Sequence, residues 1–323
     1  MKRKFTLIII MLIIMTALAA CSGEQKQPQT TEQPNQESEQ NQQETAQLPA
    51  EDRAGNKIVI PSEINKIISI SPSNTEMIVD LGLGDKLVAV DKYSGDIEGI
   101  PENIPYFDIM NPDVEQLVAL EPDIIYATGM SMSQGNDPFK PIKDLGITVA
   151  YIPASDSIEG IYDDIMFIAD SLQVNSKGQE LVDTMKTKID TFKEIGSTIE
   201  NKKTVYFEIA GAPNLYSFGS GVFLNEMIEL LGAENILAAQ DKWISVSDEV
   251  IVAANPDIIL TNVDYIENAV DEIKNRAGWE NVTAIKNNDV YYIDRDASSL
   301  SNHNIVKALE QMAEAIYPDV YTK

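Results

Sequence analysis

Two stretches of the chain repeat the same pattern in the same order. Residues 115–128 read EQLVALEPDIIYAT, and residues 249–262 read EVIVAANPDIILTN. Each begins with a short apolar helical run, reaches a proline that ends the helix, and continues into β-forming residues. Residues 76–89 and 226–238 form a second matching pair, again in the same order. The repetition predicts a chain built from two related halves.

Each half contains short runs rich in Ile, Val and Tyr that predict buried strands. They lack polar–apolar alternation, as expected of parallel strands covered on both faces. The predicted strands are residues 66–70, 87–91, 123–128 and 148–152 in the first half and 204–209, 236–238, 257–261 and 289–293 in the second. Because helical patterns separate these strands, the predicted fold class is α/β, with two Rossmann-like lobes built on parallel sheets.

Residues 157–200 lie between the halves and carry apolar residues at spacings of three and four, which indicate helix. Ser176 followed by Gln179 suggests a capping box, so we expect a rigid helix of about 23 residues, roughly 35 Å long, that joins the lobes. The predicted domains are a signal peptide at residues 1–20, a lipidated cysteine and disordered linker at 21–50, a first lobe at 51–156, the helical bridge at 157–200 and a second lobe at 201–323.

The N-terminal segment has the layout of a secretory signal. Lys2, Arg3 and Lys4 precede an apolar run, and the sequence LAAC ends at Cys21, as in a bacterial lipobox. Acyl chains on Cys21 would hold the protein at the cell membrane, outside the cytoplasm. The alternative is a chance free cysteine, but Cys21 is the only cysteine, so no disulfide explains it. Residues 22–50 offer almost nothing to bury and predict a flexible spacer.

Charge and missing motifs argue against several classes of function. With 51 acidic against 24 basic residues and a net charge of −27, the chain is poorly suited to nucleic acid. A single histidine, His303, argues against a zinc or manganese cage, and there is no Gly-x-Ser-x-Gly elbow of a hydrolase. The Gly-Leu-Gly at Gly82 follows a helical run and predicts a helix C-cap, not a dinucleotide loop. We therefore expect no catalytic residues, no cofactor and no directly bound metal. We also expect the protein to be a monomer.

Four motifs in a fixed order carry a resemblance: IISISPSNTE at residues 67–76, NPDVEQLVALEPDII at 111–125, WISVSDE at 243–249 and VYYID at 290–294. The chain from about residue 52 to 317 resembles the helix-linked substrate-binding lipoproteins of ABC importers for cobalamin, ferric siderophores and haem. The resemblance implies two lobes joined by one stiff helix, a ligand cleft between them and modest closure. It also implies delivery of the chelate to a permease dimer with its ATPase subunits. The alternatives are an extracytoplasmic α/β enzyme or a ligand sensor that uses the same cleft.

Open α/β sheets bind ligands in the loops beyond the carboxyl ends of their strands. Those loops predict mostly aromatic, uncharged ligand-binding side chains: Ser73, Tyr93, Met130, Met132, Tyr216, Phe218, Trp243, Tyr265, Arg295 and His303. The alternative for Tyr216, Phe218 and Trp243 is that they cover the hydrophobic core and do not touch a ligand. His303 would bind a metal only if the ligand were haem or a corrinoid. Beyond the signal the chain has only three arginines, so we expect a ferric hydroxamate or a corrinoid and not a polyanionic chelate.

Glu76 and Glu226 hold equivalent positions in the two halves. In the resembling family, glutamates at these motif positions contact arginines on the two permease subunits, so we expect Glu76 and Glu226 to dock the permease. The alternative for Glu76 is a capping box with Ser73, whereas the residues before Glu226 offer no such partner.

Overall fold

The computed structural model describes residues 48–132 and 137–321 of the chain. All of them belong to the unit formed by residues 45–323. The predictions for the signal peptide, for Cys21 and for nearly all of the linker therefore lie outside the described residues. None of the described helices is long and apolar enough to cross a membrane.

The first lobe is built on a five-stranded parallel sheet with the order β3-β2-β1-β4-β5. Its strands are β1 Ile67–Ser69, β2 Leu87–Asp91, β3 Tyr106–Phe107, β4 Ile124–Ala127 and β5 Thr148–Tyr151. The four longer strands are almost wholly buried and match the predicted runs within two residues. The edge strand β3 was not predicted, because two residues leave no apolar run in the sequence.

Short helices connect these strands: α1 Pro72–Ile78, the irregular turns η1 Val79–Leu83 and η2 Gly84–Lys86, α2 Val114–Ala119, η3 Gly129–Ser131 and α3 Lys140–Asp144. Gly82 has a φ of 75°, which ends the helical run as the Gly-Leu-Gly pattern predicts. The N-cap of α1 is Ser71, and it makes no side-chain cap. The capping box between Ser73 and Glu76 therefore does not form.

The second lobe contains a four-stranded parallel sheet with the order β11-β10-β6-β8. Its strands are β6 Thr204–Glu208, β8 Glu234–Asn235, β10 Ile258–Thr261 and β11 Val290–Tyr292. The predicted strand at 236–238 is wrong, because the chain already turns there. The side chain of Asn235 sets this turn: its amide oxygen accepts from Leu237 N (3.0 Å) and its amide nitrogen donates to the Phe218 carbonyl (3.0 Å).

A separate antiparallel pair, β7 Tyr216–Phe218 and β9 Trp243–Ser245, also belongs to this lobe. The sequence interpretation put these residues in loops, so their backbone is more ordered than expected. The helices of the lobe are α6 Phe223–Leu230, α7 Asp248–Ala254, α8 Ala269–Lys274, α9 Thr283–Asn287, α10 Arg295–Ser299, α11 Ile305–Ile316 and α12 Pro318–Tyr321.

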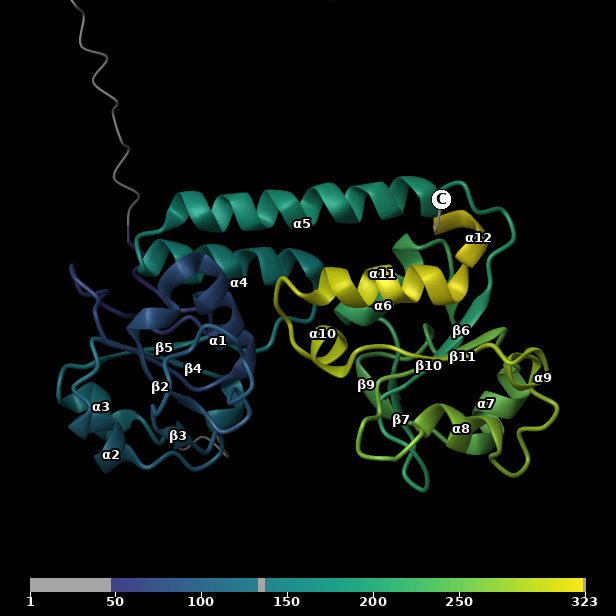
Figure 1. The fold of residues 1–323 in the computed structure, drawn as a ribbon, viewed down its shortest axis with the longest axis horizontal. Helices are drawn as coiled ribbons and strands as arrows, with labels where there is room; N and C mark the ends of the chain where they lie inside the picture. The colour runs from purple at the N-terminus through teal and green to yellow at the C-terminus, as the bar shows by residue number, and fades with distance from the viewer. Residues whose placement is uncertain (1–47, 133–136, 322–323) are drawn as a thin grey trace, which may run out of the picture. The chain divides into compact units, whose positions relative to one another are not determined.

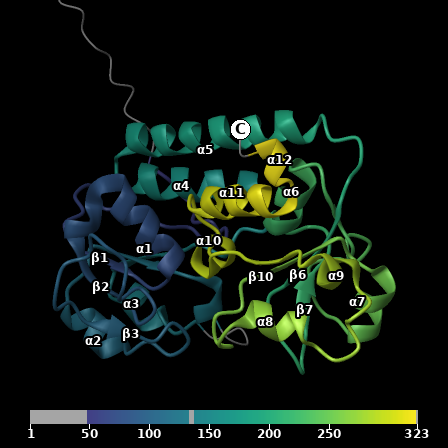
Figure 2. The same cartoon turned by 45° about the vertical axis from the view of Figure 1, so that its right-hand side comes forward.

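Two helices, α4 Ile158–Ser171 and α5 Asn175–Gly196, form the bridge. The 22 residues of α5 span about 33 Å at 1.5 Å per residue. Along this length α5 contacts α4 and then α6, α11 and α12 of the second lobe (Figure 1, Figure 2). The predicted long bridging helix is confirmed, but its capping box is wrong. The N-cap is Val174, and Gln179 bonds to Asp183 instead.

The apolar core has three parts. One cluster covers one face of both sheets and runs through α1, α4, α5, α6 and α11. The opposite face of the first sheet packs on α2 and α3, and that of the second packs on α7, α8 and α9. Because the two lobes share the first cluster, their separation would expose apolar surface, which favours small relative movements.

Candidate ligand-binding cleft

A cavity of about 1010 Å³ is lined by residues of both lobes. From the first lobe come Ser71 to Ser73 after β1, Tyr93 after β2 and Met130 after β4. The second lobe contributes Arg295, Asp296 and residues 299–301, which follow β11, and Asn304 and Lys307. The cavity thus lies beyond the carboxyl ends of the strands, where open α/β sheets bind ligands. Its volume suits a large organic molecule.

A second cavity of about 520 Å³ adjoins the first, because Arg295 and Ser299 line both. Trp243 and Tyr265 contribute its aromatic surface. The hydroxyl of Tyr265 accepts a hydrogen bond from Gly211 N (2.9 Å), which fixes the orientation of the ring. Together the two cavities offer a binding surface that continues from the first lobe into the second.

Acidic side chains outnumber basic ones around the larger cavity. The acids are Glu76, Asp80, Asp96, Glu98 and Asp296, and the bases are Lys92, Arg295 and Lys307. Two of the bases are already paired: Lys92 with Asp108, and Arg295 with Asp264 at 3.4 Å. The cleft therefore presents a net negative field to a ligand.

Six of the ten predicted ligand-binding residues lie in the walls of these cavities. Ser73, Tyr93, Met130 and Arg295 line the larger one, and Trp243, Tyr265 and again Arg295 line the smaller one. The exposed fractions of Tyr93 (64%) and Met130 (61%) leave most of each side chain open to a ligand. Whether any of the six binds ligand stays a prediction.

A buried carboxylate orients the loop that carries Tyr93. Asp91 ends β2 and is fully buried, and it accepts hydrogen bonds from Tyr93 N (2.8 Å) and from the hydroxyl of Ser94. Burial raises the pKa of Asp91 above its ordinary value, against these hydrogen bonds, which lower it. The sequence interpretation missed Asp91, although an acid that ends a buried strand and precedes Tyr-Ser is a recognisable turn signal.

Phe218 does not reach the cleft. It is completely buried, and its ring packs against Phe207 and edge-on against Trp243, with centroids 5.6 and 5.8 Å away. The prediction of ligand contact is therefore wrong for Phe218, which instead packs against Trp243 in the core. Tyr216 and Met132 are 37% and 39% exposed but line neither cavity.

His303 is nearly buried and lines neither cavity. It is 7% exposed, and its Nε2 bonds to the carboxylate of Asp80. Its Nδ1 is buried without a hydrogen-bond partner among the described residues. Within the described part of the chain, no three His, Cys, Asp or Glu side chains gather in a way that could hold a metal ion.

The two predicted docking residues are engaged inside the protein. The carboxylate of Glu76 accepts from Asn302 and Asn304 of the second lobe, at 2.6 and 2.9 Å. Glu226 accepts from Ile158 N (2.9 Å) and so satisfies an open N–H group at the start of α4. Glu226 thus has a partner 68 residues away in the sequence, which its neighbouring residues did not suggest.

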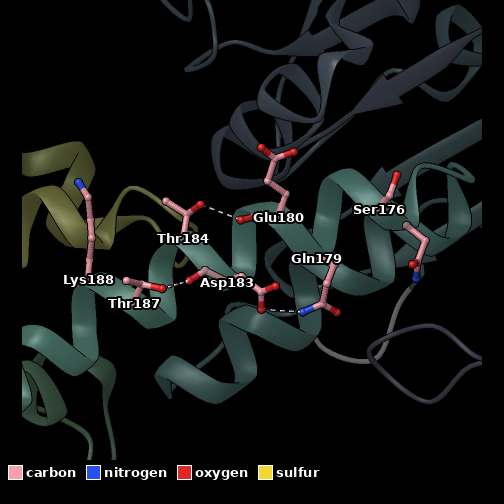
Figure 3. A pocket seen from close by; sticks show the side chains of 8 residues that line it. Ser176, Gln179, Glu180, Asp183, Thr184, Thr187 and Lys188 are labelled. Atoms are coloured by element: carbon pink, nitrogen blue, oxygen red, sulfur yellow. Dashed lines mark hydrogen bonds between the residues drawn. The ribbon is translucent and has the colours of Figure 1, made fainter.

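A further hollow of about 710 Å³ runs along α5 (Figure 3). Its described lining comes from this helix alone, and several of the side chains bond within the helix. Thr184 donates to the Glu180 carbonyl (2.8 Å) and Gln179 to Asp183 (2.9 Å). Lys188 bonds to Glu310 of α11 (3.0 Å), and Asn175 bonds to Asp170 of α4. The lining is a solvated face of exposed polar side chains, most of them already hydrogen-bonded, so this hollow is not a candidate site.

Comparison with known proteins agrees with this geometry. The sequence profile described as periplasmic binding protein matches residues 67–297. YvrC of Bacillus subtilis, an uncharacterized ABC transporter substrate-binding lipoprotein, is 32% identical over 276 residues, 84% of this chain and 86% of that protein. The vitamin B12-binding protein of Yersinia pestis is 28% identical over 200 residues, 60% of this chain and 69% of that one. A solved structure of a possible iron-binding (periplasmic solute-binding) protein from Staphylococcus epidermidis matches with a TM-score of 0.71 and 30% identity, over 79% of this chain and 100% of that one. The chain therefore belongs to the periplasmic binding protein family.

Proposed function

We propose that this protein is a lipid-anchored extracytoplasmic receptor that binds a metal chelate and delivers it to an ABC permease. Its similarity to a substrate-binding lipoprotein, to a vitamin B12-binding protein and to a possible iron-binding protein supports this role. The observation that carries the proposal is the pair of adjoining cavities at the carboxyl ends of the strands, with walls from both lobes.

The charge of the cleft narrows the proposed ligand to a neutral or cationic chelate, such as a ferric hydroxamate or a corrinoid. A polyanionic chelate would face five carboxylates in the larger cavity, and the one arginine there, Arg295, is already paired with Asp264. The aromatic and thioether surfaces of Tyr93, Met130, Trp243 and Tyr265 suit a large, largely apolar ligand. His303 is bonded to Asp80, so the metal would keep the ligands of its chelator.

Thermal shift across a charge series of chelates tests this proposal. Ferrioxamine B, cyanocobalamin, haemin and a ferric tricatecholate are added in turn to the detergent-extracted lipoprotein. A ligand present at 100 times its Kd stabilises the folded state by about 2.7 kcal/mol, which is readily measured. We expect a rise in Tm with ferrioxamine B or cyanocobalamin. No rise with any of the four would contradict the function, and a rise with the tricatecholate alone would contradict the charge argument.

Docking to the permease is the second part of the proposal, and the structure offers two repeat-related pairs of glutamates for it. Glu76 and Glu226 would have to leave internal hydrogen bonds before they could dock. Glu115 and Glu249 lie exposed in the first turns of α2 and α7. Exposed carboxylates meet a partner at lower desolvation cost, so we favour Glu115 and Glu249.

Charge reversal separates the two pairs. One variant carries Glu115→Lys with Glu249→Lys, and the matched variant carries Glu76→Lys with Glu226→Lys. Chelate affinity and uptake into cells are measured for each. We expect the first variant to keep its affinity and lose uptake. Full uptake in that variant would rule out docking by Glu115 and Glu249, and a wild-type strain that binds chelate without importing it would favour the sensor alternative.

A further inference from the structure

Three residues on one face of a helical run in the first lobe, here called the stripe, contact one short segment of the second lobe. Ser73, Glu76 and Asp80 follow the spacing i, i+3, i+7 along α1 and η1, which places them on one face. The segment 301–304, between α10 and α11, reads Ser-Asn-His-Asn. The sequence interpretation assigned Ser73 and His303 to the ligand and Glu76 to the permease, but all three side chains bond across the lobes.

Four hydrogen bonds connect the stripe and the segment in register. The hydroxyl of Ser73 donates to the Ser301 carbonyl at 2.9 Å. The carboxylate of Glu76 accepts from Nδ2 of the asparagines at 302 and 304, at 2.6 and 2.9 Å. Asp80 pairs with Nε2 of the histidine at 303. Three of these bonds end on a carboxylate, and such bonds are about twice as strong as neutral ones.

The segment is held in shape for these contacts. Asn302 is fully buried, and its amide oxygen accepts from Asn304 N at 2.8 Å, which turns its Nδ2 toward Glu76. The hydrogen bond from His303, helped by the charges of His303 and Lys307, holds the pKa of Asp80 below its ordinary value against partial burial. The carboxylate form of Asp80 is therefore the form that the contact favours.

The same stripe forms part of the cleft wall. Ser73, Glu76 and Asp80 line the larger cavity from the first lobe, and Ser301 and Asn304 line it from the second. A bond between these residues therefore fixes the separation of the two walls that a ligand would touch.

We propose that Ser73, Glu76 and Asp80 with residues 301–304 form an interlobe latch that holds the two walls of the cleft together before any ligand binds. Glu76, Asp80 and His303 are positioning residues of the ligand site: they set the resting width of the cleft. The latch does not depend on the identity of the ligand, so it can be tested without one.

Two matched variants test the latch. Glu76→Gln with Asp80→Asn removes both charged acceptors at nearly constant volume. Glu98→Gln with Asp96→Asn removes the same charge from the same cavity wall, from exposed side chains for which the described structure shows no hydrogen bond across the lobes. The comparison separates loss of the latch from loss of negative charge.

The readout is the distance between the lobes in the absence of ligand. Spin labels are attached at Glu102→Cys in the first lobe and Lys286→Cys in the second, both exposed sites, in the full chain with Cys21→Ser. We expect one narrow distance distribution for the unmodified latch and for the control. In the latch variant the ratio of closed to open molecules should fall about tenfold, the effect of losing roughly 1.4 kcal/mol of hydrogen bonding to charged acceptors.

Two further measurements keep the test decisive. The melting temperature shows whether the latch variant is folded, and if it is not, the single change Asp80→Asn is compared with Asp80→Glu, which retains a carboxylate. Asp80→Glu should keep more closed molecules than Asp80→Asn. A distance distribution identical in the latch and control variants, with both proteins folded, would overturn the latch and leave the proposed chelate function untouched.

Discussion

Replacing Trp243 by alanine should weaken chelate binding far more than it weakens the fold. The residue is 37% exposed and lines the smaller cavity. A tryptophan side chain offers up to about 250 Å², so a ligand could cover roughly 90 Å² of it. At about 25 cal/mol per Å² this contact contributes ~2.3 kcal/mol, or a factor of about 50 in Kd. Because part of such burial is offset on binding, we expect the Kd to rise between tenfold and fiftyfold.

Tyr216→Ala is the matched control for this prediction. Tyr216 is also 37% exposed and belongs to β7, the strand paired with β9, but it lines neither cavity. Affinity is measured by titration with the chelate that gives the largest thermal shift, and stability is measured by urea unfolding. Both variants should lose stability, and only Trp243→Ala should lose affinity. If Trp243→Ala kept the wild-type Kd while its free energy of unfolding fell, Trp243 would be a core residue and the ligand would bind elsewhere.

Three further variants test the electrostatics and packing. Asp80→Asn should lower Tm at pH 7, and the difference in Tm from the wild type should disappear as the pH falls below 3.8. A carboxyl group whose pKa is lowered by folding stabilises the folded state at pH values above its ordinary pKa, and this stabilisation is lost as the pH falls through the pKa of the folded state. A difference in Tm that stayed constant with pH would contradict the pairing with His303. Arg276→Met should cost about 3–5 kcal/mol in urea unfolding, because it leaves the buried carboxylate of Glu208 unpaired; a cost under about 1 kcal/mol would argue against a buried charge pair. Gly196→Ala should cost about 1–3 kcal/mol, because its Cβ would lie 2.1 Å from a backbone carbonyl oxygen of α6; unchanged stability would show that this end of the bridge can shift freely.

The architecture was predictable because it depends on repeated, strongly apolar signals. Buried strands such as Ile124–Ala127 and Ile258–Thr261 are runs of β-forming residues that no solvent-facing residue interrupts. The repeated Pro-Asp pair marks where each of these two strands begins. The strand predicted at 236–238 does not form, although the chain there is apolar. The hydrogen bonds of the Asn235 side chain turn the chain away from the sheet at this point.

The candidate site was predictable in outline and not in detail. The rule that ligands lie beyond the carboxyl ends of strands led to Tyr93, Met130 and Arg295, which the structure places in the cavity walls. The same rule could not tell that Phe218 points into the core, because β7 and β9 are three residues each and carry no clear alternation. Contacts between distant segments, such as Glu76 with Asn302, leave no local pattern in one sequence.

The fluorescence of Trp243 tests most directly whether the chelate binds in the cleft. The chain has two tryptophans, and the other, Trp279, is fully buried in the second lobe. In Trp279→Phe, Trp243 is the only tryptophan left, and iron chelates and corrinoids quench tryptophan fluorescence at contact distance. We predict saturable quenching by ferrioxamine B or cyanocobalamin, with the midpoint of the quenching curve matching the Kd of the wild-type protein. Tight binding to the wild-type protein without quenching of Trp243 in the folded variant would show that the ligand site is not this cleft.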